Sequence, residues 1–118
     1  LAERQAAQHG ASVYMYLFTW ETPVLGGKLK SPHALEIPFV FDNVATDRLS
    51  GDIQTKFALA EKMSQTWLAF ARTGNPNNGA IPEWPGYSSE HRATMIFDNE
   101  CRIENDPMSA ERRAWPPS

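Results

Sequence analysis

The segment Ser12–Trp20 is the feature that most constrains how this chain can fold. It predicts a β-strand whose alternate side chains form two sets: Val13, Met15, Leu17 and Thr19 on one face, and Tyr14, Tyr16, Phe18 and Trp20 on the other. Both sets are mostly apolar, which is typical of a strand inside a sheet that helices cover on both sides. The preceding Leu1–Gln8 is rich in helix formers, and Gly10 suits a helix end. Together these features predict an α/β sheet.

One long amphipathic helix is expected further along the chain. Ser50 or Asp52 can cap its start, and the helix should run to about Thr73. Its apolar residues recur at spacings of three and four, which predicts one buried stripe: Ile53, Phe57, Ala60, Met63, Trp67 and Phe70. Gly74 suits the end of this helix, and Pro76 prevents its continuation.

The remaining predicted elements are short. Phe39–Phe41 follows Pro38, which permits an edge strand or a helical turn but disfavours an internal strand. Ala93–Asp98 and Cys101–Glu104 read as strands around a tight turn, and Met108–Arg113 reads as a short helix. One long helix and these short elements are too few to cover both faces of so apolar a first strand. The chain is therefore expected to be an α/β segment that is incomplete as a free-standing domain.

Composition excludes several classes of function. The net charge of −3 and the scattered Lys and Arg residues give no reason to expect nucleic acid or an anionic membrane as a partner. No apolar stretch is long enough to span a bilayer. Cys101 is the only cysteine and is interpreted as a small core residue. The three histidines are far apart in sequence, so no metal-ligand spacing is convincing, and no phosphate-binding glycine loop is present.

His33 is the candidate for chemistry. It follows the Pro- and Gly-containing loop Glu21–Pro32, which leaves the carboxyl end of the first strand, where open α/β sheets collect their active sites. Histidine is suited to moving protons near neutral pH. From position alone, a histidine that only packs or hydrogen-bonds in its loop is the simpler interpretation. Ser31 is too close in sequence to form a triad-like pair with it, and Glu36 can either belong to a site or bond backbone N–H groups at a turn.

Three stretches carry a family resemblance. His33–Phe41 resembles a His-Gly-x-Glu-(Ile/Leu)-Pro-(Phe/Tyr)-Val-Phe motif. Trp67–Asn77, and Trp84–Tyr87 followed by Thr94–Phe97, match in the same order and spacing. These stretches resemble the type-B carboxylesterases, the cholinesterase-like branch of the α/β-hydrolases. Residues 1–118 resemble the C-terminal segment of that single catalytic domain.

The resemblance implies a function for the whole domain. Family members hydrolyse carboxylic esters with a Ser–His–acid triad and need no metal or organic cofactor. Carried over, His33 matches the triad histidine and Glu36 an acid just behind the active site, while the serine, the triad acid and the oxyanion hole lie upstream. The implied partners are a small-molecule ester and that missing N-terminal part. Ala34 stands where the family commonly has Gly; if the position needs a positive φ, alanine costs roughly 1 kcal/mol or more.

Two functions stay open at this point. The chain is either the part of a serine carboxylesterase that supplies the triad histidine, or part of a cholinesterase-like protein that has lost its serine and serves in binding. The isolated chain is expected to have no triad esterase activity. It is also expected to expose apolar faces that favour self-association.

Overall fold

The computed structural model describes residues 2–7, 11–28, 31, 34–45, 51 and 54–114. Within them the chain begins with helix α1 (Ala2–Ala7), strand β1 (Met15–Phe18) and a short 3₁₀ helix (Val24–Gly27). It continues with the helices α2 (Ile37–Val40) and α3 (Thr55–Thr73). Strands β2 (Ala93–Phe97) and β3 (Arg102–Asn105) and helix α4 (Ser109–Ala114) complete the fold. The helical turn at α2, with Pro38 in its first turn, is one of the two outcomes expected there.

The sheet has the order β1-β2-β3. Strands β1 and β2 run parallel, with Met15 opposite Thr94 and Phe18 opposite Phe97, and β3 pairs antiparallel with β2. The predicted hairpin is confirmed, with a longer turn than expected. Within the described residues β1 pairs on one edge only, so its position inside the sheet of a larger domain stays a prediction. Strand β2 is central among the described strands, and all five of its residues are buried.

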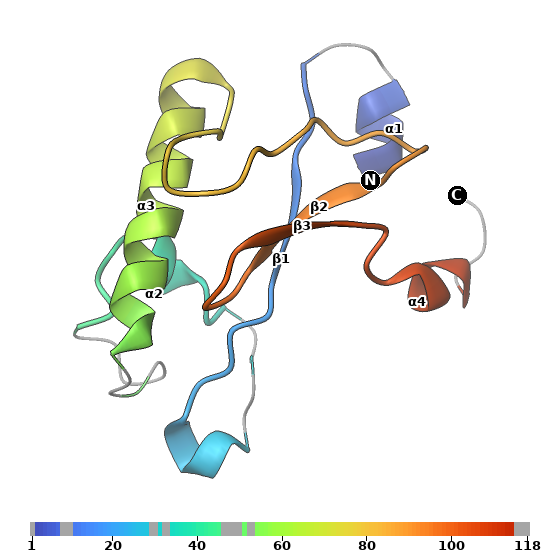
Figure 1. The fold of residues 1–118 in the computed structure, drawn as a ribbon. Coiled ribbons are helices and arrows are strands. Elements are labelled where there is room, and N and C mark those ends of the chain that lie inside the picture. The colour runs from blue at the N-terminus through green and yellow to red at the C-terminus, as the bar shows by residue number, and fades with distance from the viewer. Residues whose placement is uncertain are drawn as a thin grey trace.

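Helices lie on both sides of the sheet, as the sequence predicts (Figure 1). Helices α2 and α3 stand on one side of the strands, and α1 and α4 on the other. The core joins the end of β1, the α2 turn, α3 and the sheet through Trp20, Leu35, Phe39, Met63 and Phe97, each at most 2% exposed. Among the described residues, no helix is both long enough and apolar enough to cross a membrane.

Helix α3 ends where the sequence predicts, but its start and its buried face differ from the prediction. It ends at Gly74, which has the expected left-handed conformation (φ +76°) and donates its N–H to the Phe70 carbonyl. It begins later than predicted, with Gln54 as its N-cap; Ser50, Asp52 and Ile53 lie outside the described residues. The buried side chains are Lys56, Leu59, Ala60, Met63 and Thr66.

The predicted stripe of α3 is therefore partly wrong. Phe57 and Phe70 are 42% and 48% exposed, whereas the Lys56 side chain is buried. The Lys56 ammonium donates to the backbone carbonyl of Val44 at 2.9 Å and also to that of Gly51. These charge-assisted hydrogen bonds satisfy the buried amine and turn that side of the helix inward.

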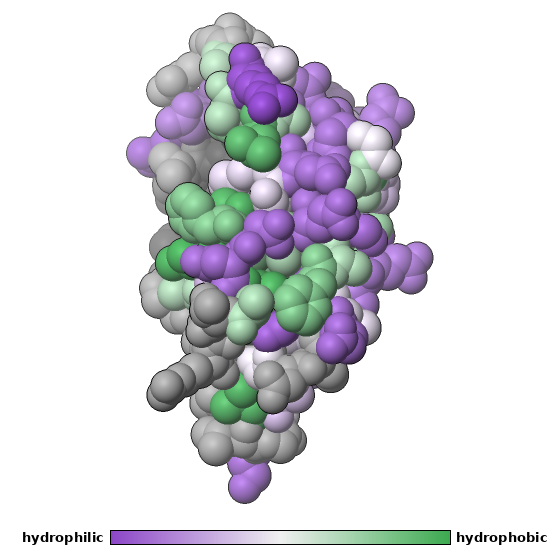
Figure 2. Space-filling model, turned by 90° about the vertical axis from the view of Figure 1, so that its left-hand side faces the viewer, coloured by the Kyte–Doolittle hydropathy of each residue, from purple (hydrophilic) through white to green (hydrophobic). Residues whose placement is uncertain are grey.

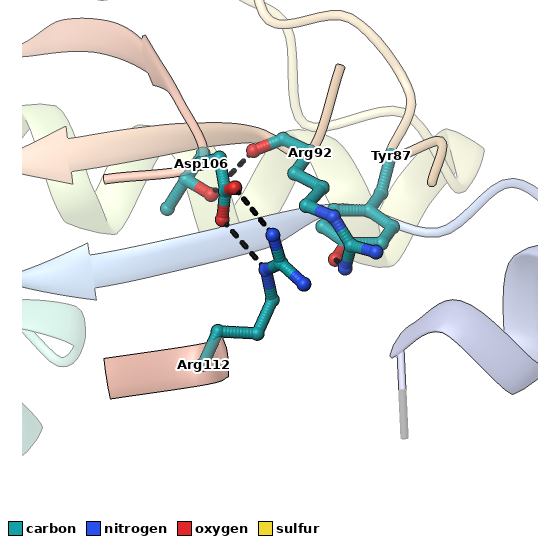
Figure 3. A network of polar contacts seen from close by, with 5 residues as sticks. Tyr87, Arg92, Asp106 and Arg112 are labelled. Carbon is teal, nitrogen blue, oxygen red and sulfur yellow. Dashed lines mark hydrogen bonds and ion pairs between the residues drawn. The ribbon is translucent and has the colours of Figure 1, made fainter. Parts of the chain in front are cut away.

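A polar clamp joins the end of the hairpin to α4 (Figure 3). The Arg112 guanidinium donates two hydrogen bonds to the Asp106 carboxylate, at 3.0 and 2.8 Å. The Asp106 backbone N–H donates to the Arg92 carbonyl at 3.0 Å, and the Arg92 side chain donates to the Tyr87 hydroxyl at 3.3 Å. Bidentate Arg–carboxylate pairing fixes orientation as well as charge, so this clamp sets the position of α4.

Candidate functional site

The carboxyl ends of β1 and β2 are fastened to each other. Beyond the last paired residues, the Thr19 N–H donates to the Phe97 carbonyl at 3.0 Å. The Thr19 hydroxyl donates to the Asp98 carboxylate at 2.6 Å, and the Trp20 indole N–H donates to the Asn99 side-chain oxygen at 3.1 Å. This is the edge of the sheet at which α/β proteins gather their functional groups.

His33 lies outside the described residues, and the chain on either side of it is anchored at this edge. On one side, the Ser31 hydroxyl donates to the Phe18 carbonyl at 3.4 Å, so Ser31 has a partner in the strand. On the other side, Leu35 is fully buried. The Phe39 ring packs 5.2 Å from the Phe18 ring and 5.1 Å from the Trp20 ring, measured between centroids. The sequence segment that carries His33 therefore starts and ends against the last residues of β1.

Ala34 has a left-handed backbone conformation, with φ of +68°. This is the condition under which alanine carries a steric cost that glycine does not. The Ala34 carbonyl accepts a hydrogen bond from the Ile37 N–H at 3.3 Å, which closes the turn that leads into α2. The strain therefore lies in the residue that directly follows His33.

Glu36 occupies the N-cap position of α2 and is half-buried. Its backbone carbonyl accepts the N–H groups of Phe39 and Val40, both at 3.0 Å. Its carboxylate makes no side-chain hydrogen bond that caps α2. The interpretation in which the Glu36 side chain bonds backbone N–H groups of this turn is therefore not supported by a helix cap. The pKa of Tyr16 is raised, mainly by burial and further by the negative charge of Glu36.

The surroundings of the other residues considered in the sequence agree with structural rather than catalytic roles. Burial raises the pKa of the Cys101 thiol, which disfavours the thiolate and agrees with its interpretation as a core residue. His91 is exposed in the turn before β2, and His9 lies outside the described residues. Trp84 and Tyr14 pack edge to face, 5.6 Å apart between ring centroids. In the part of the chain that the structure describes, no three His, Cys, Asp or Glu residues gather as a metal site.

Sequence reasoning missed the pairs that fasten the two strand ends, Thr19 with Asp98 and Trp20 with Asn99. The partners in each pair are 79 residues apart, so no local pattern connects them. A signal was present all the same, because polar residues follow both apolar strands directly. Aligning the two strands in parallel, with Phe18 opposite Phe97, would have brought these residues together.

A parallel strand pair with helices on both sides and a polar loop at the carboxyl ends is typical of a segment of an α/β domain. The chain belongs to the carboxylesterase family, whose model matches residues 1–115. It is 39% identical over 124 residues to the para-nitrobenzyl esterase of Bacillus subtilis (strain 168), covering 100% of this chain and 24% of that protein. It is 33% identical over 90 residues to the human cocaine esterase, covering 73% of this chain and 16% of that enzyme.

A solved structure shows the same fold. The carboxylesterase EST55 of Geobacillus stearothermophilus superposes with a TM-score of 0.81 at 46% sequence identity, over 98% of this chain and 24% of that one. The chain thus spans about a quarter of the length of the para-nitrobenzyl esterase and of EST55. Its α/β architecture is a segment of the α/β-hydrolase fold of carboxylesterases.

Proposed function

We propose that this chain supplies the triad histidine, His33, to a serine carboxylesterase that acts on small-molecule carboxylic esters. Family membership supports the reaction class. The observation that carries the assignment is the anchoring of the segment around His33, through Ser31 and Phe39, at the carboxyl ends of two parallel strands. In this proposal the chain forms the C-terminal segment of the catalytic domain, and the other catalytic groups lie upstream.

His33 acts as a proton carrier in the proposed mechanism. It takes the proton of the serine hydroxyl as that oxygen attacks the ester carbonyl, and it then gives the proton to the leaving alcohol. An upstream carboxylate holds the other ring nitrogen. Proton transfer of this kind contributes about 10²–10⁴-fold. Upstream backbone N–H groups stabilise the tetrahedral oxyanion, at about 3–4 kcal/mol for each donor.

Glu36 has a positioning role in this proposal. It lies three residues after His33, and its charge already influences Tyr16. A negative charge near an imidazole favours the imidazolium, which is the form that exists after the serine proton has been taken. Glu36 therefore supports the charged state of His33 without contacting the substrate.

Replacing His33 tests the proposal directly. In the full-length esterase, His33→Ala is expected to lower kcat/KM for a p-nitrophenyl ester by at least about 10²–10⁴-fold. His91→Ala is the matched control, because His91 is exposed in a turn outside the proposed site. Activity near that of the unmodified enzyme after His33→Ala would refute the proposal.

A serine-directed phosphonate probe separates this function from the non-catalytic alternative. The full-length protein is expected to be labelled on a serine within a Gly-x-Ser-x-Gly sequence. A parent protein that lacks this sequence and resists the probe would instead be a binding module.

A further inference from the structure

A buried tryptophan, Trp20, stands at the start of the loop that leads to His33. It lies two residues beyond the end of β1 and is only 2% exposed. Its indole N–H donates to the side-chain oxygen of Asn99 at 3.1 Å, and Asn99 lies two residues beyond the end of β2. Apolar packing is non-directional, whereas a hydrogen bond requires alignment of its donor and acceptor. The bond to Asn99 therefore fixes the orientation of the indole ring as well as its position.

The Trp20 ring also contacts the segment that follows His33. Its centroid lies 5.1 Å from that of the Phe39 ring in α2, and Phe39 is fully buried. Leu35, which also follows His33, belongs to the same buried cluster as both rings. Because protein cores are close-packed and transmit strain, a shift of the indole ring would displace the turn that leads into α2. Trp20 thus links the end of β2 to the chain that directly follows His33.

Asn99 is exposed, yet its side chain serves a buried group. On the α3 side of the molecule, polar side chains stand among apolar ones at the surface (Figure 2). Gln65 of α3 is exposed, and its amide donates to Glu61, one turn earlier on the same helix, at 3.3 Å. The Asn99 oxygen instead accepts from an indole that is 79 residues away in sequence. Removing the Asn99 side chain therefore takes the acceptor from the indole and leaves the core filled.

A second asparagine holds a tryptophan at another place in the fold. The Asn77 side chain donates to the Trp84 carbonyl at 2.8 Å and accepts the Trp84 backbone N–H at 2.6 Å. The Trp84 ring packs 5.6 Å from the ring of Tyr14, which precedes β1, so this pair supports the amino-terminal end of the strand. Asn77 therefore provides a comparison in which the fold loses hydrogen bonds at a different end of β1.

We infer that Trp20 and Asn99 are positioning residues for His33. The Asn99 oxygen fixes the indole ring, and the ring fixes the turn that directly follows His33. This inference rests on the proposed function, in which His33 carries a proton from the serine to the leaving alcohol. Such a base must stay within hydrogen-bond reach of the serine hydroxyl, and a misplacement of about 1 Å can cost about 10²-fold in rate. Trp20 and Asn99 act through His33, without contacting the substrate.

Replacing Asn99 in the full-length protein tests the inference. Asn99→Ala is expected to lower kcat for a p-nitrophenyl ester about tenfold and to leave KM within about twofold, because a displaced proton carrier slows the chemical steps rather than the binding of the ester. Asn99→Asp keeps an acceptor oxygen at the same place and is expected to keep kcat within about twofold of that of the unmodified protein. Trp20→Phe keeps a ring but loses the donor, so combining it with Asn99→Ala should lower kcat no further than Trp20→Phe alone.

Asn77→Ala and Gln65→Ala are the controls. The first removes hydrogen bonds that hold another tryptophan, and the second removes an exposed amide, so both are expected to keep the kcat of the unmodified protein. A kcat for Asn99→Ala equal to that of the unmodified protein, or an equal loss of kcat in Asn77→Ala, would overturn the inference.

The His33→Ala background separates positioning from a general effect on the fold. Loss of a triad residue leaves a residual turnover that depends on binding and on the oxyanion hole. Adding Asn99→Ala to His33→Ala should leave this residual rate unchanged, because Asn99 acts through the imidazole that is then missing; a further loss of about tenfold would overturn the inference. Full activity of His33→Ala would instead refute the proposed function, whereas the inference alone fails if activity depends on His33 but not on Asn99.

Discussion

At the scale of single residues, Ala34 combines an ordinary side chain with an unusual backbone. Its φ of +68° is one that glycine adopts freely and alanine does not. We therefore expect Ala34→Gly to stabilise the full-length protein by about 1 kcal/mol, measured as a higher midpoint of urea unfolding. Ala58→Gly, on the exposed face of α3, should instead destabilise it by about 0.5–1 kcal/mol, because glycine is disfavoured within a helix. If both substitutions lowered the midpoint, Ala34 would not be strained.

A second prediction at this scale concerns the charge of Glu36. Its charge helps to raise the pKa of Tyr16, so Glu36→Gln should lower that pKa towards its ordinary value. An ultraviolet titration of the phenolate, with Tyr16→Phe identifying the signal, measures the change. By the same reasoning, loss of this charge should lower the pKa on the acidic limb of the kcat/KM profile, which reports His33 in the proposed mechanism. An unchanged profile would leave Glu36 with no positioning role.

At the scale of elements, the clamp between Asp106 and Arg112 makes the stability of the α4 attachment depend on pH. The hydrogen bonds from Arg112, and then its charge, hold the pKa of Asp106 below its ordinary value of 3.8. A carboxyl with a lowered folded-state pKa stabilises the fold above its unfolded pKa, and this contribution is lost as the pH falls through the lowered value. The contribution should therefore be complete above about pH 4.

Arg112→Met tests the clamp. Between pH 7 and pH 3, the thermal midpoint of the unmodified protein should fall more than that of Arg112→Met, because the variant has no pair to lose. Arg113→Met is the control for the loss of a positive charge, since Arg113 neighbours Arg112 on α4, is exposed, and is the weakest of the causes that lower the pKa of Asp106. Equal slopes for all three proteins would show that the clamp does not contribute.

The elements also show how far sequence reasoning reaches. Local signals succeeded where the interactions are local, as with Gly74 at the end of α3 and the antiparallel pairing of β2 with β3. The buried face of α3 was mispredicted because Lys56 reaches the carbonyls of Val44 and Gly51 in the segment that precedes the helix, and side-chain type alone does not reveal such partners. In the candidate site, His33 and Glu36 came from a motif, whereas Thr19 and Asp98 required the three-dimensional pairing of two strands.

At the scale of the whole molecule, the chain is less compact than its length allows. The radius of gyration is 15.2 Å, against about 13.5 Å for a compact domain of this length. The accessible surface is 7890 Å², against roughly 6,450 Å² for a compact monomer of this mass. Phe41, at 73% exposed, and Ile37, at 51%, are among the apolar side chains left uncovered. The fold is a segment that requires further cover.

The isolated 118-residue chain is therefore expected to self-associate at micromolar concentration, as measured by sedimentation velocity. It should also show no ester turnover that depends on His33. A monomer that unfolds cooperatively and hydrolyses esters until His33 is replaced would contradict both expectations.

The fastening of β1 to β2 has a consequence for the order of folding. Helix α3 and the β2–β3 hairpin are local in sequence, whereas Thr19 and Asp98 are 79 residues apart. Closing so long a loop costs entropy before any contact compensates for it, and such distant parallel pairings form slowly. Strand β1 should dock after the local elements have formed. The candidate site at its carboxyl end is thus expected to be among the last parts of the chain to become ordered.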